Sequence, residues 1–424
     1  MRKIKVLTIS DHPLSPSGVG TQTKYIIEAL LNSGKFEVVS LGGAIRHPDH
    51  KPQKTEQFGD LWTIYPVDGY GTPDAVRSIL RTERPDILWF MTDPRFFPWL
   101  WAIEQEVRPL VPMVYYHVWD NKPYPMFNKR YYDSNDMIVT ISKITDEIVA
   151  NVSPTVDREY LPHAVDGSIF TPMSQKDVDE FKQKFYQHND REDGDKFTFF
   201  WNNRNARRKQ TGSILFWFKD FLDEIGHDKA RLIMHTDPKD PHGQDVVAIM
   251  ERIGLTDGQV LLSTQKIAPE RLAQFYNIAD CTINVSDAEG FGLATLESLS
   301  CATPIIVNMT GGLQDQVTDG ENWFGIGIEP SSKAIIGSQE VPYIYEDRIS
   351  KEDFINALKT MYNMPAADRS AMGLAGREFT LSNFNFQNFG QRWVNLLEEV
   401  HEKNGSWNHA EGRKNYKGWE HIEL

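Results

Sequence analysis

The sequence predicts an α/β protein made of two successive Rossmann-like domains, each built on a doubly wound parallel sheet. Three observations support this fold class. Short β-rich runs alternate with helical patterns through most of the chain. The alternation is interrupted once, by a polar and strongly charged stretch at 168–196, and then begins again. The length of 424 residues leaves room for two or three domains of ordinary size.

The first domain, placed at residues 1–175, begins with a β-α-β unit. A strand is expected at 3–9, an amphipathic helix at 21–31 and a second strand at 36–41. The same alternation continues with strands at 86–90, 111–116 and 137–141 and helices at 73–81, 127–134 and 142–152.

The second domain is placed at residues 190–384, after a solvated helix and a linker. Its expected strands are 197–201, 231–235, 260–262, 281–285 and 304–307, and its helices include 269–279, 293–300, 351–362 and 365–379. Residues 326–347 carry few helix signals, so we interpret them as an insertion or a lid. A last helix is expected at 387–403, and the polar tail from Asn404 is expected to be partly mobile.

Composition excludes several classes of protein. The formal net charge of −14 argues against a nucleic-acid partner, which requires a basic face. The longest apolar runs fall well short of the roughly 18 residues that a membrane helix needs. Only two cysteines occur, Cys281 and Cys301, both in a predicted buried segment. Such sparse cysteine indicates a reducing compartment, and we expect a cytoplasmic protein.

The most informative stretch runs from residue 280 to 307. A short strand is followed by a turn that contains Gly290 and Gly292, and then by a helix. Backbone N–H groups of Phe291, Gly292 and Leu293 are therefore expected at a positive helix end, which is a typical phosphate site.

Two carboxylates flank that turn. Glu289 lies before the predicted helix and Glu297 lies on it, eight residues later. Carboxylates accept hydrogen bonds from hydroxyl groups, so both suit ligands such as ribose and hexose. A phosphate site between two carboxylates matches the chemistry of a nucleotide sugar.

A basic loop follows the first strand of the second domain. In W-N-N-R-N-A-R-R-K-Q-T-G, Arg204 and Lys209 lie five residues apart, and we expect both to reach one diphosphate. Their charge would serve in place of a metal ion. The D-x-D of Asp193 and Asp195 is interpreted as part of a solvated linker, and the sequence shows no zinc-type spacing of His and Cys, so no metal site is expected.

Two further candidates lie in the first domain. The loop P-S-G-V-G opens the first helix with Gly18 and Gly20, but Thr23 replaces the third glycine of the dinucleotide fingerprint. His117 follows the strand 111–116, and ligands bind at the carboxyl ends of parallel strands. A satisfied core histidine is the alternative there.

The segment E-G-F-G-L-A-T-L-E, followed by A-T-P-I-I, resembles the E-x7-E signature of family 4 retaining glycosyltransferases. These enzymes have the GT-B fold, in which two Rossmann-like domains face each other across a cleft. The basic loop resembles the family's G-R-x4-K-G element, with Asn203 and Gln210 in place of the glycines. Similarly, P-S-G-V-G resembles its G-G-V-G loop, with Ser17 in place of one glycine. In this family the terminal helix, here within 385–424, completes the first domain.

The resemblance implies a retaining transfer of a hexose from a UDP- or GDP-sugar to a hydroxyl acceptor, with no further cofactor and no metal. It assigns the ribose to Glu297 and the sugar to Glu289 and His117, which we take as the catalytic candidates. The diphosphate is assigned to the basic loop and the glycine turns, namely Arg204, Lys209, Gly18, Gly20, Phe291, Gly292 and Leu293.

Two alternatives remain open at this stage. The chain can be a Rossmann-type nucleotide-sugar epimerase or oxidoreductase, although the incomplete glycine fingerprint counts against it. It can also be a non-catalytic sugar-binding protein, although the presence of Glu289 together with Arg204 and Lys209 counts against that. The sequence does not indicate the base, the hexose, the acceptor or the oligomeric state.

Overall fold

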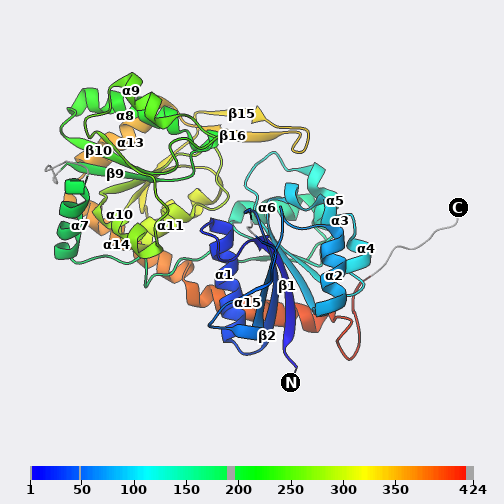
Figure 1. Ribbon diagram of the computed structural model, residues 1–424. Helices are drawn as coiled ribbons and strands as arrows, with labels where there is room; N and C mark the ends of the chain where they lie inside the picture. The colour runs from blue at the N-terminus through cyan, green and yellow to red at the C-terminus, as the bar shows by residue number, and fades with distance from the viewer. Residues whose placement is uncertain (1, 47–48, 189–195, 417–424) are drawn as a thin grey trace. The chain divides into compact units, whose positions relative to one another are not determined.

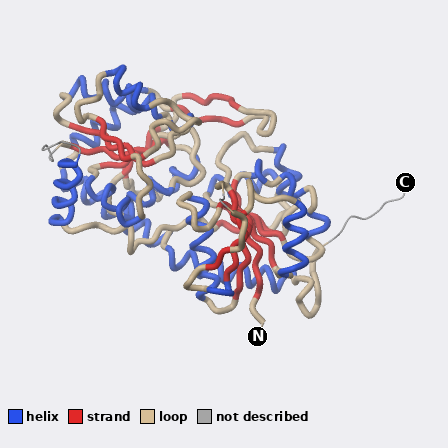
Figure 2. The backbone as a smooth tube through the Cα atoms, viewed as in Figure 1, coloured by secondary structure: helices blue, strands red, loops and turns tan. Residues whose placement is uncertain are grey.

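Two parallel β-sheets, one in each of two compact units, form the framework of the structure (Figure 1). The computed structural model describes residues 2–46, 49–188 and 196–416. Unit 1 comprises Met1–Ala164, Gly337–Ile344 and Phe386–Leu424, and unit 2 comprises Val165–Ile336 and Tyr345–Asn385. Helices cover both faces of each sheet (Figure 2). The expected class of two Rossmann-like domains is confirmed.

The sheet of unit 1 has the strand order β3-β4-β2-β1-β5-β6-β7-β8. All neighbours are parallel except β3 and β4. Its strands are β1 (Ile4–Asp11), β2 (Phe36–Gly43), β3 (Gln53–Lys54), β4 (Trp62–Pro66), β5 (Ile87–Thr92), β6 (Met113–His117), β7 (Met137–Thr140) and β8 (Arg158–Tyr160). Its helices are α1 (Gly18–Asn32), α2 (Pro73–Glu83), α3 (Pro98–Trp101), α4 (Glu104–Val107), α5 (Lys129–Asp133), α6 (Lys143–Val152) and the C-terminal α15 (Phe386–Asn404). Short 3₁₀ turns are η1 (Gly59–Leu61), η2 (Pro94–Phe96) and η3 (Met126–Asn128).

The sheet of unit 2 has the order β11-β10-β9-β12-β13-β14, with parallel neighbours throughout. Its strands are β9 (Phe197–Asn202), β10 (Ala230–His235), β11 (Val260–Ser263), β12 (Cys281–Asn284), β13 (Ile305–Asn308) and β14 (Gly325–Ile328), and a separate hairpin contains β15 (Ser332–Ile336) and β16 (Ile344–Arg348). The helices are α7 (Gln175–His188), α8 (Thr211–Ile225), α9 (Val246–Ile253), α10 (Pro269–Ile278), α11 (Leu293–Ser300), α12 (Gln314–Val317), α13 (Lys351–Asn363) and α14 (Ala366–Asn383). The 3₁₀ turns are η4 (Arg207–Lys209) and η5 (Gly311–Leu313).

Strands of unit 2 are apolar along their length and polar at their carboxyl ends. Phe199 and Trp201 of β9 are fully buried, as expected for a parallel sheet covered on both faces. The register pairs Asn202 with His235, and His235 with Ser263, so neighbouring strands end together in polar residues. The carboxyl edge of a parallel sheet is where ligands bind in this class of fold.

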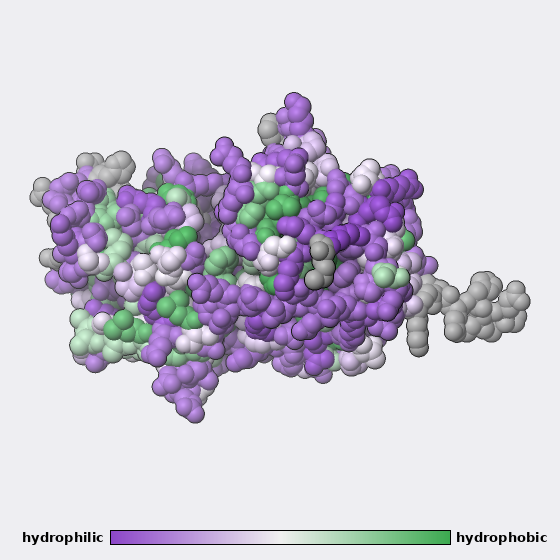
Figure 3. Space-filling view, turned by 90° about the horizontal axis from the view of Figure 1, so that it is seen from below, coloured by the Kyte–Doolittle hydropathy of each residue, from purple (hydrophilic) through white to green (hydrophobic). Residues whose placement is uncertain are grey.

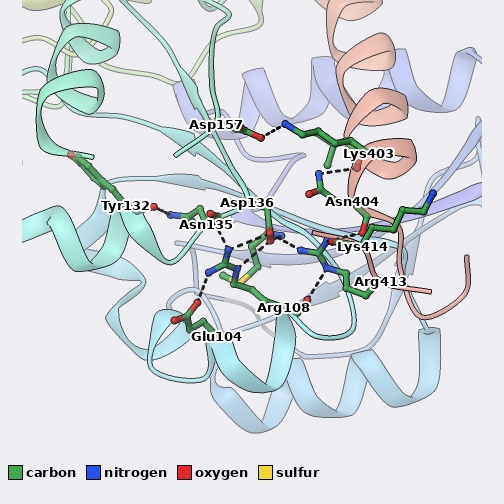
Figure 4. A network of polar contacts seen from close by, with 12 residues as sticks. Glu104, Arg108, Tyr132, Asn135, Asp136, Asp157, Lys403, Asn404, Arg413 and Lys414 are labelled. Atoms are coloured by element: carbon green, nitrogen blue, oxygen red, sulfur yellow. Dashed lines mark hydrogen bonds and ion pairs between the residues drawn. The ribbon is translucent and has the colours of Figure 1, made fainter. Parts of the chain in front are cut away.

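The C-terminal segment belongs to unit 1. Trp393 of α15 packs edge-on against Tyr116, with ring centroids 4.8 Å apart. Beyond α15, Arg413 forms an ion pair with Asp136 at 2.5 Å, and Arg108 lies 3.3 Å from the same carboxylate oxygen (Figure 4). Both Arg413 and Asp136 are almost fully buried. Buried ionic contacts therefore hold residues 405–416 on unit 1, and the expected partial mobility of the tail stays a prediction.

The expected insertion at 326–347 contains regular structure. It includes most of β14 and the two strands of the β15–β16 hairpin. The prediction missed these strands because β15 is largely exposed and has no clear alternation of apolar and polar residues.

The face shown in Figure 3 is mostly hydrophilic, with hydrophobic side chains in separate patches. Within the described parts of the chain, no helix is both long and apolar enough to cross a membrane.

Candidate functional site

The turn between β12 and α11 forms the centre of the candidate site in unit 2. Helix α11 begins at Leu293, as predicted, and Gly292 is its N-cap residue with a φ of 91°. This left-handed conformation favours glycine. A Cβ atom at Gly292 would also lie 2.5 Å from Cδ2 of Leu313, so the position is too close-packed for a side chain. The first N–H groups of an α-helix have no partners within the helix and are available to an anion.

A second glycine turn, which contains Gly312, packs against the turn that contains Gly292. Gly312 donates its N–H to the carbonyl oxygen of Glu289 at 3.0 Å. A Cβ atom on Gly312 would lie 2.6 Å from Cα of Phe291, so the two turns are in direct backbone contact. Gln316 donates from Nε2 to the carbonyl oxygen of Phe291 at 2.7 Å. These bonds fix the backbone of residues 289–292.

Two cations meet the carboxylate of Glu289. Lys209 donates from Nζ to Oε2 of Glu289, and Arg208 places Nη1 3.7 Å from the same oxygen. Burial of Glu289 favours its neutral form, but Lys209 and Arg208 outweigh this effect and lower its pKa. Glu289 is therefore ionised at neutral pH, and both of its carboxylate oxygens act only as hydrogen-bond acceptors.

The side chain of Arg204 contacts the loop after β10. Its Nε donates to Oδ2 of Asp240 at 2.6 Å, Nη2 lies 2.7 Å from Nδ1 of His242, and its side chain is 62% exposed. The structure thus pairs Arg204 with the loop after β10, and the expectation that Arg204 and Lys209 reach one diphosphate stays a prediction. The chain turns through η4 between them, so Arg204 points to the loop after β10 while Lys209 points to Glu289. Sequence reasoning missed Arg208, which has no spacing signal of its own.

Gln210 explains how the basic loop keeps its shape without the glycine of the resembled motif. Its φ of 58° is in the left-handed region, which costs a non-glycine residue roughly 1 kcal/mol. The side chain offsets this cost, because Nε2 donates to Oδ2 of Asp287 and Oε1 accepts from Ser213. Burial raises the pKa of Asp287 to about 6.

The base of the β15–β16 hairpin also reaches the site. Glu346 is almost fully buried and accepts hydrogen bonds from Nη1 of Arg207 at 2.9 Å and Nη2 of Arg348 at 3.1 Å. The N–H of Asp347 donates to the carbonyl oxygen of Asp287 at 2.8 Å. The hairpin thus anchors both the basic loop and the turn that carries Glu289, a role that no sequence motif indicated.

Glu297 lies on the first turns of α11 in a different environment. Tyr276 of α10 donates from Oη to Oε2 of Glu297 at 2.7 Å, and Asn202 donates from Nδ2 to Oη of Tyr276 at 2.8 Å. Burial raises the pKa of Glu297 to about 7, and the hydrogen bond from Tyr276 works in the opposite direction. Sequence reasoning did not identify Asn202 or Tyr276, because long-range pairing leaves no local pattern.

In unit 1, Gly18 and Gly20 lie in the first turn of α1. Ser17 is the N-cap residue and its Oγ accepts from the N–H of Gly20, which is why serine fits in place of a glycine. A Cβ atom at Gly20 would lie 2.8 Å from the carbonyl oxygen of His12, so this glycine is needed for close packing. Gly18 is exposed. A role for either in binding a diphosphate stays a prediction.

His117 is fully buried at the end of β6. Nδ1 lies 3.0 Å from Oη of Tyr115, and Nε2 lies 2.7 Å from Oη of Tyr132. Burial lowers the pKa of His117 to about 3, so the ring is neutral. The strand does end where ligands bind, but the ring turns inward between two tyrosines. His117 is a core residue in this arrangement, which does not favour a contact with the sugar. Asp193 and Asp195 lie outside the described residues.

The family match to known proteins lies mostly in unit 2. Residues 182–361 match the family model described as glycosyl transferases group 1. The alpha-monoglucosyldiacylglycerol synthase of Streptococcus pneumoniae is 26% identical over 186 residues, which are 43% of this chain. The matched stretch spans only 40% of that relative.

Solved structures resemble the whole chain. Sucrose-phosphate synthase from Thermosynechococcus elongatus has a TM-score of 0.74 at 16% identity and covers 95% of this chain and 100% of its own. Alr3699/HepE from Anabaena, in complex with UDP and glucose, has a TM-score of 0.68 at 14% identity, covering 93% of this chain and 100% of its own. These similarities show a GT-B type fold. The basic loop, Glu289 and Glu297 all lie within the matched family region, whereas His117 lies outside it.

Proposed function

We propose that this protein is a retaining glycosyltransferase of the family 4 type, which transfers a hexose from a nucleoside diphosphate sugar to a hydroxyl of a glycan or another acceptor. The observation that carries the proposal is the meeting of Lys209 and Arg208 at Glu289, beside the N-terminus of α11. This arrangement combines positive charge and backbone N–H groups for a diphosphate with a carboxylate for sugar hydroxyls.

In the proposed reaction, the bond from the anomeric carbon to the diphosphate breaks and a bond to the acceptor oxygen forms on the same face. The transition state has oxocarbenium character, as in glycosidic cleavage generally. Negative charge grows on the departing diphosphate, where Lys209, Arg208 and the N–H groups at 291–293 stabilise it. The departing phosphate oxygen takes the proton of the acceptor hydroxyl.

The two glutamates have separate roles in this proposal. Glu289 is held by Lys209 and accepts hydrogen bonds from hydroxyls of the hexose, rather than acting as a nucleophile. Glu297 accepts hydrogen bonds from the ribose. Positive charge from the basic loop serves the diphosphate without requiring a metal ion.

The solved neighbours make UDP the first nucleotide to test. One is in complex with UDP and glucose, and another, from E. coli, is bound with UDP-2-fluoro glucose. GDP stays open as the alternative. We also place the protein in the cytoplasm, and the two free, buried cysteines are consistent with a reducing compartment.

The test begins with a thermal-shift screen of UDP, GDP and ADP and their sugars, followed by measurement of donor consumption with and without candidate acceptors. Glu289→Ala should slow transfer about 100-fold or more while leaving nucleotide affinity within a few-fold. Glu297→Ala should instead weaken nucleotide binding. Glu321→Ala, at an exposed site in unit 2, is the matched control.

Transfer by the Glu289→Ala variant at the normal rate would refute the role of Glu289. Failure of every nucleotide sugar to bind or be consumed would refute the proposed function. A fluorescence signal from bound nicotinamide cofactor would favour the oxidoreductase alternative.

A further inference from the structure

A chain of three side chains links the sheet of unit 2 to Glu297. Asn202 is the last residue of β9, Tyr276 lies on α10 and Glu297 lies on α11. Nδ2 of Asn202 donates to Oη of Tyr276 at 2.8 Å, and Oη donates to Oε2 of Glu297 at 2.7 Å. An amide NH₂ group can only donate, so the hydroxyl proton of Tyr276 is directed to the carboxylate.

We propose that Tyr276, held by Asn202, is a positioning residue that presents the carboxylate of Glu297 to the two ribose hydroxyls of the donor nucleotide. Tyr276 itself touches no ligand in this arrangement, because it is fully buried. The inference rests on the proposed function, since it assumes that a nucleotide binds at Glu297. It goes beyond that function by assigning discrimination between ribose and deoxyribose to a residue behind the site.

The surroundings of Tyr276 leave its hydroxyl a single orientation. Its ring packs edge-on against Phe200, with centroids 5.1 Å apart, and against Phe170 at 6.1 Å. Such packing fixes the ring in one rotamer. The hydroxyl therefore holds Oε2 in place, rather than following the carboxylate as it moves.

One oxygen of Glu297 is left for the ligand. Within the described part of the chain, no residue donates a hydrogen bond to Oε1, and Glu297 retains some exposed surface. A carboxylate has about four lone-pair directions, so Oε1 and the second lone pair of Oε2 can accept from the 2′- and 3′-hydroxyls together. Fixing Oε2 sets the plane of the carboxylate, which a bidentate contact with a diol requires.

The same geometry affects titration. The ionisable groups that face Glu297 are Tyr276 and, one turn along its own helix, Cys301. Arg377 of α14 donates to the carbonyl oxygens of Ser300 and Phe170. Burial raises the pKa of Glu297 to about 7, and the hydroxyl of Tyr276 opposes that rise. Loss of the hydroxyl therefore moves the pKa further upward.

The test compares ribose with deoxyribose nucleotides. Calorimetry would measure the Kd of UDP and of 2′-deoxy-UDP for the wild type and for Tyr276→Phe, with GDP and 2′-deoxy-GDP if the screen favours guanosine. The wild type should prefer the ribonucleotide about tenfold, since a hydrogen bond to a charged group is worth that much. Tyr276→Phe should bind UDP roughly five- to tenfold more weakly, lose most of the preference and leave deoxynucleotide binding little changed.

Tyr186→Phe is the matched control, because Tyr186 is also buried in unit 2 and its hydroxyl faces Thr198 instead of Glu297. It should leave both Kd values unchanged. A pH series with UDP-glucose, whose diphosphate does not titrate near neutrality, gives a second readout. The midpoint of the binding profile should move to higher pH in Tyr276→Phe.

The possible outcomes separate this inference from the proposed function. If Tyr276→Phe keeps the wild-type preference and pH profile, the inference fails while nucleotide binding stands. If the wild type binds no nucleotide, both fail. Should circular dichroism show that Tyr276→Phe is unfolded, Asn202→Ala provides the same test, since it frees the tyrosine hydroxyl. An unchanged preference in that variant would also overturn the inference.

Discussion

Glu289 and Glu297 carry the same carboxyl group, yet their surroundings shift their ionisation in opposite directions. Burial acts against the charge of both. At Glu289 the nearby Lys209 and Arg208 outweigh burial, so its pKa is lowered. At Glu297 the only opposing influence is a neutral tyrosine, and the pKa rises to about 7. In the free protein Glu289 is thus ionised at neutral pH, whereas the ionisation of Glu297 changes with pH near neutrality.

Glu297→Gln should alter how stability depends on pH. Because the pKa of Glu297 is higher in the folded state than its ordinary value near 4.5, the folded protein holds a proton that the unfolded chain releases between about pH 4.5 and 7. Wild-type stability therefore falls across this window, by about 3 kcal/mol. Glutamine keeps an acceptor for Tyr276 but does not titrate.

Thermal or denaturant unfolding at pH 5 and pH 8 measures this effect. The Glu297→Gln variant should have a higher free energy of unfolding than the wild type at pH 8. At pH 5 the two free energies should be nearly equal. The exposed Glu321→Gln serves as control and should follow the wild type at both values. An equal difference between Glu297→Gln and wild type at the two pH values would contradict the assigned pKa.

Individual site residues were predictable only where a local pattern marks them. Glu289, Glu297 and Lys209 could be singled out because their spacing and the glycine turn are visible in the sequence, and their roles stay predictions. The role of Arg204 stays a prediction, and its contact with Asp240 could not be foreseen, since spacing along the chain does not reveal the turn η4 between it and Lys209. Tyr276 was not found because its link to Glu297 spans two helices.

At the scale of elements, strong local signals predicted boundaries well. Helix α11 spans 293–300, as expected, because the glycine turn begins it and Thr303-Pro304 follows its end. The β15–β16 hairpin was not predicted as strands, since it forms a separate two-stranded sheet in which β15 is largely exposed and β16 is mostly half-buried. Its function as an anchor rests on Glu346, which is a buried charge that the sequence presents as an ordinary acidic residue.

Glu346→Gln should disturb the basic loop, although residue 346 lies on strand β16, outside that loop. The change removes the buried negative charge that holds Arg207 and Arg348, whose own side chains are 60% and 41% exposed, so solvent screens part of each ion pair. We expect about 1–2 kcal/mol less stability and roughly five- to tenfold weaker binding of a nucleotide sugar.

Denaturant unfolding and calorimetric titration measure the two effects of Glu346→Gln. Glu340→Gln, at an exposed position between the two strands of the same hairpin, is the control and should change neither. If Glu346→Gln lost stability while binding the nucleotide sugar normally, the hairpin would stabilise the fold without determining the geometry of the site.

At the scale of the whole molecule, unit 1 contains segments from both ends of the chain. The chain leaves unit 1 after Ala164, rejoins it for Gly337–Ile344 and returns to it again from Phe386. Residues 405–416 then bring Arg413 to Asp136, 277 positions away in sequence. The parallel sheets and the return of the last helix were predictable from alternation and resemblance, whereas this pairing has no local signal.

Arg413→Ala tests whether this return is a structural requirement. The guanidinium of Arg413 is almost fully buried, and besides Asp136 it donates to the carbonyl oxygens of Arg108 and Asn404. Removing it takes one of two guanidinium partners from the buried Asp136 and a donor from each of the two carbonyl oxygens, so we expect a loss of about 3 kcal/mol. Arg392→Ala, which breaks an exposed pair with Glu159, should cost less than about 1 kcal/mol.

Hydrogen exchange should show faster exchange in β6 and β7 of Arg413→Ala, while added nucleotide still protects residues 202–212 and 284–293. Faster exchange in unit 2 to the same extent would mean that the C-terminal segment stabilises the molecule as one cooperative body, rather than unit 1 alone.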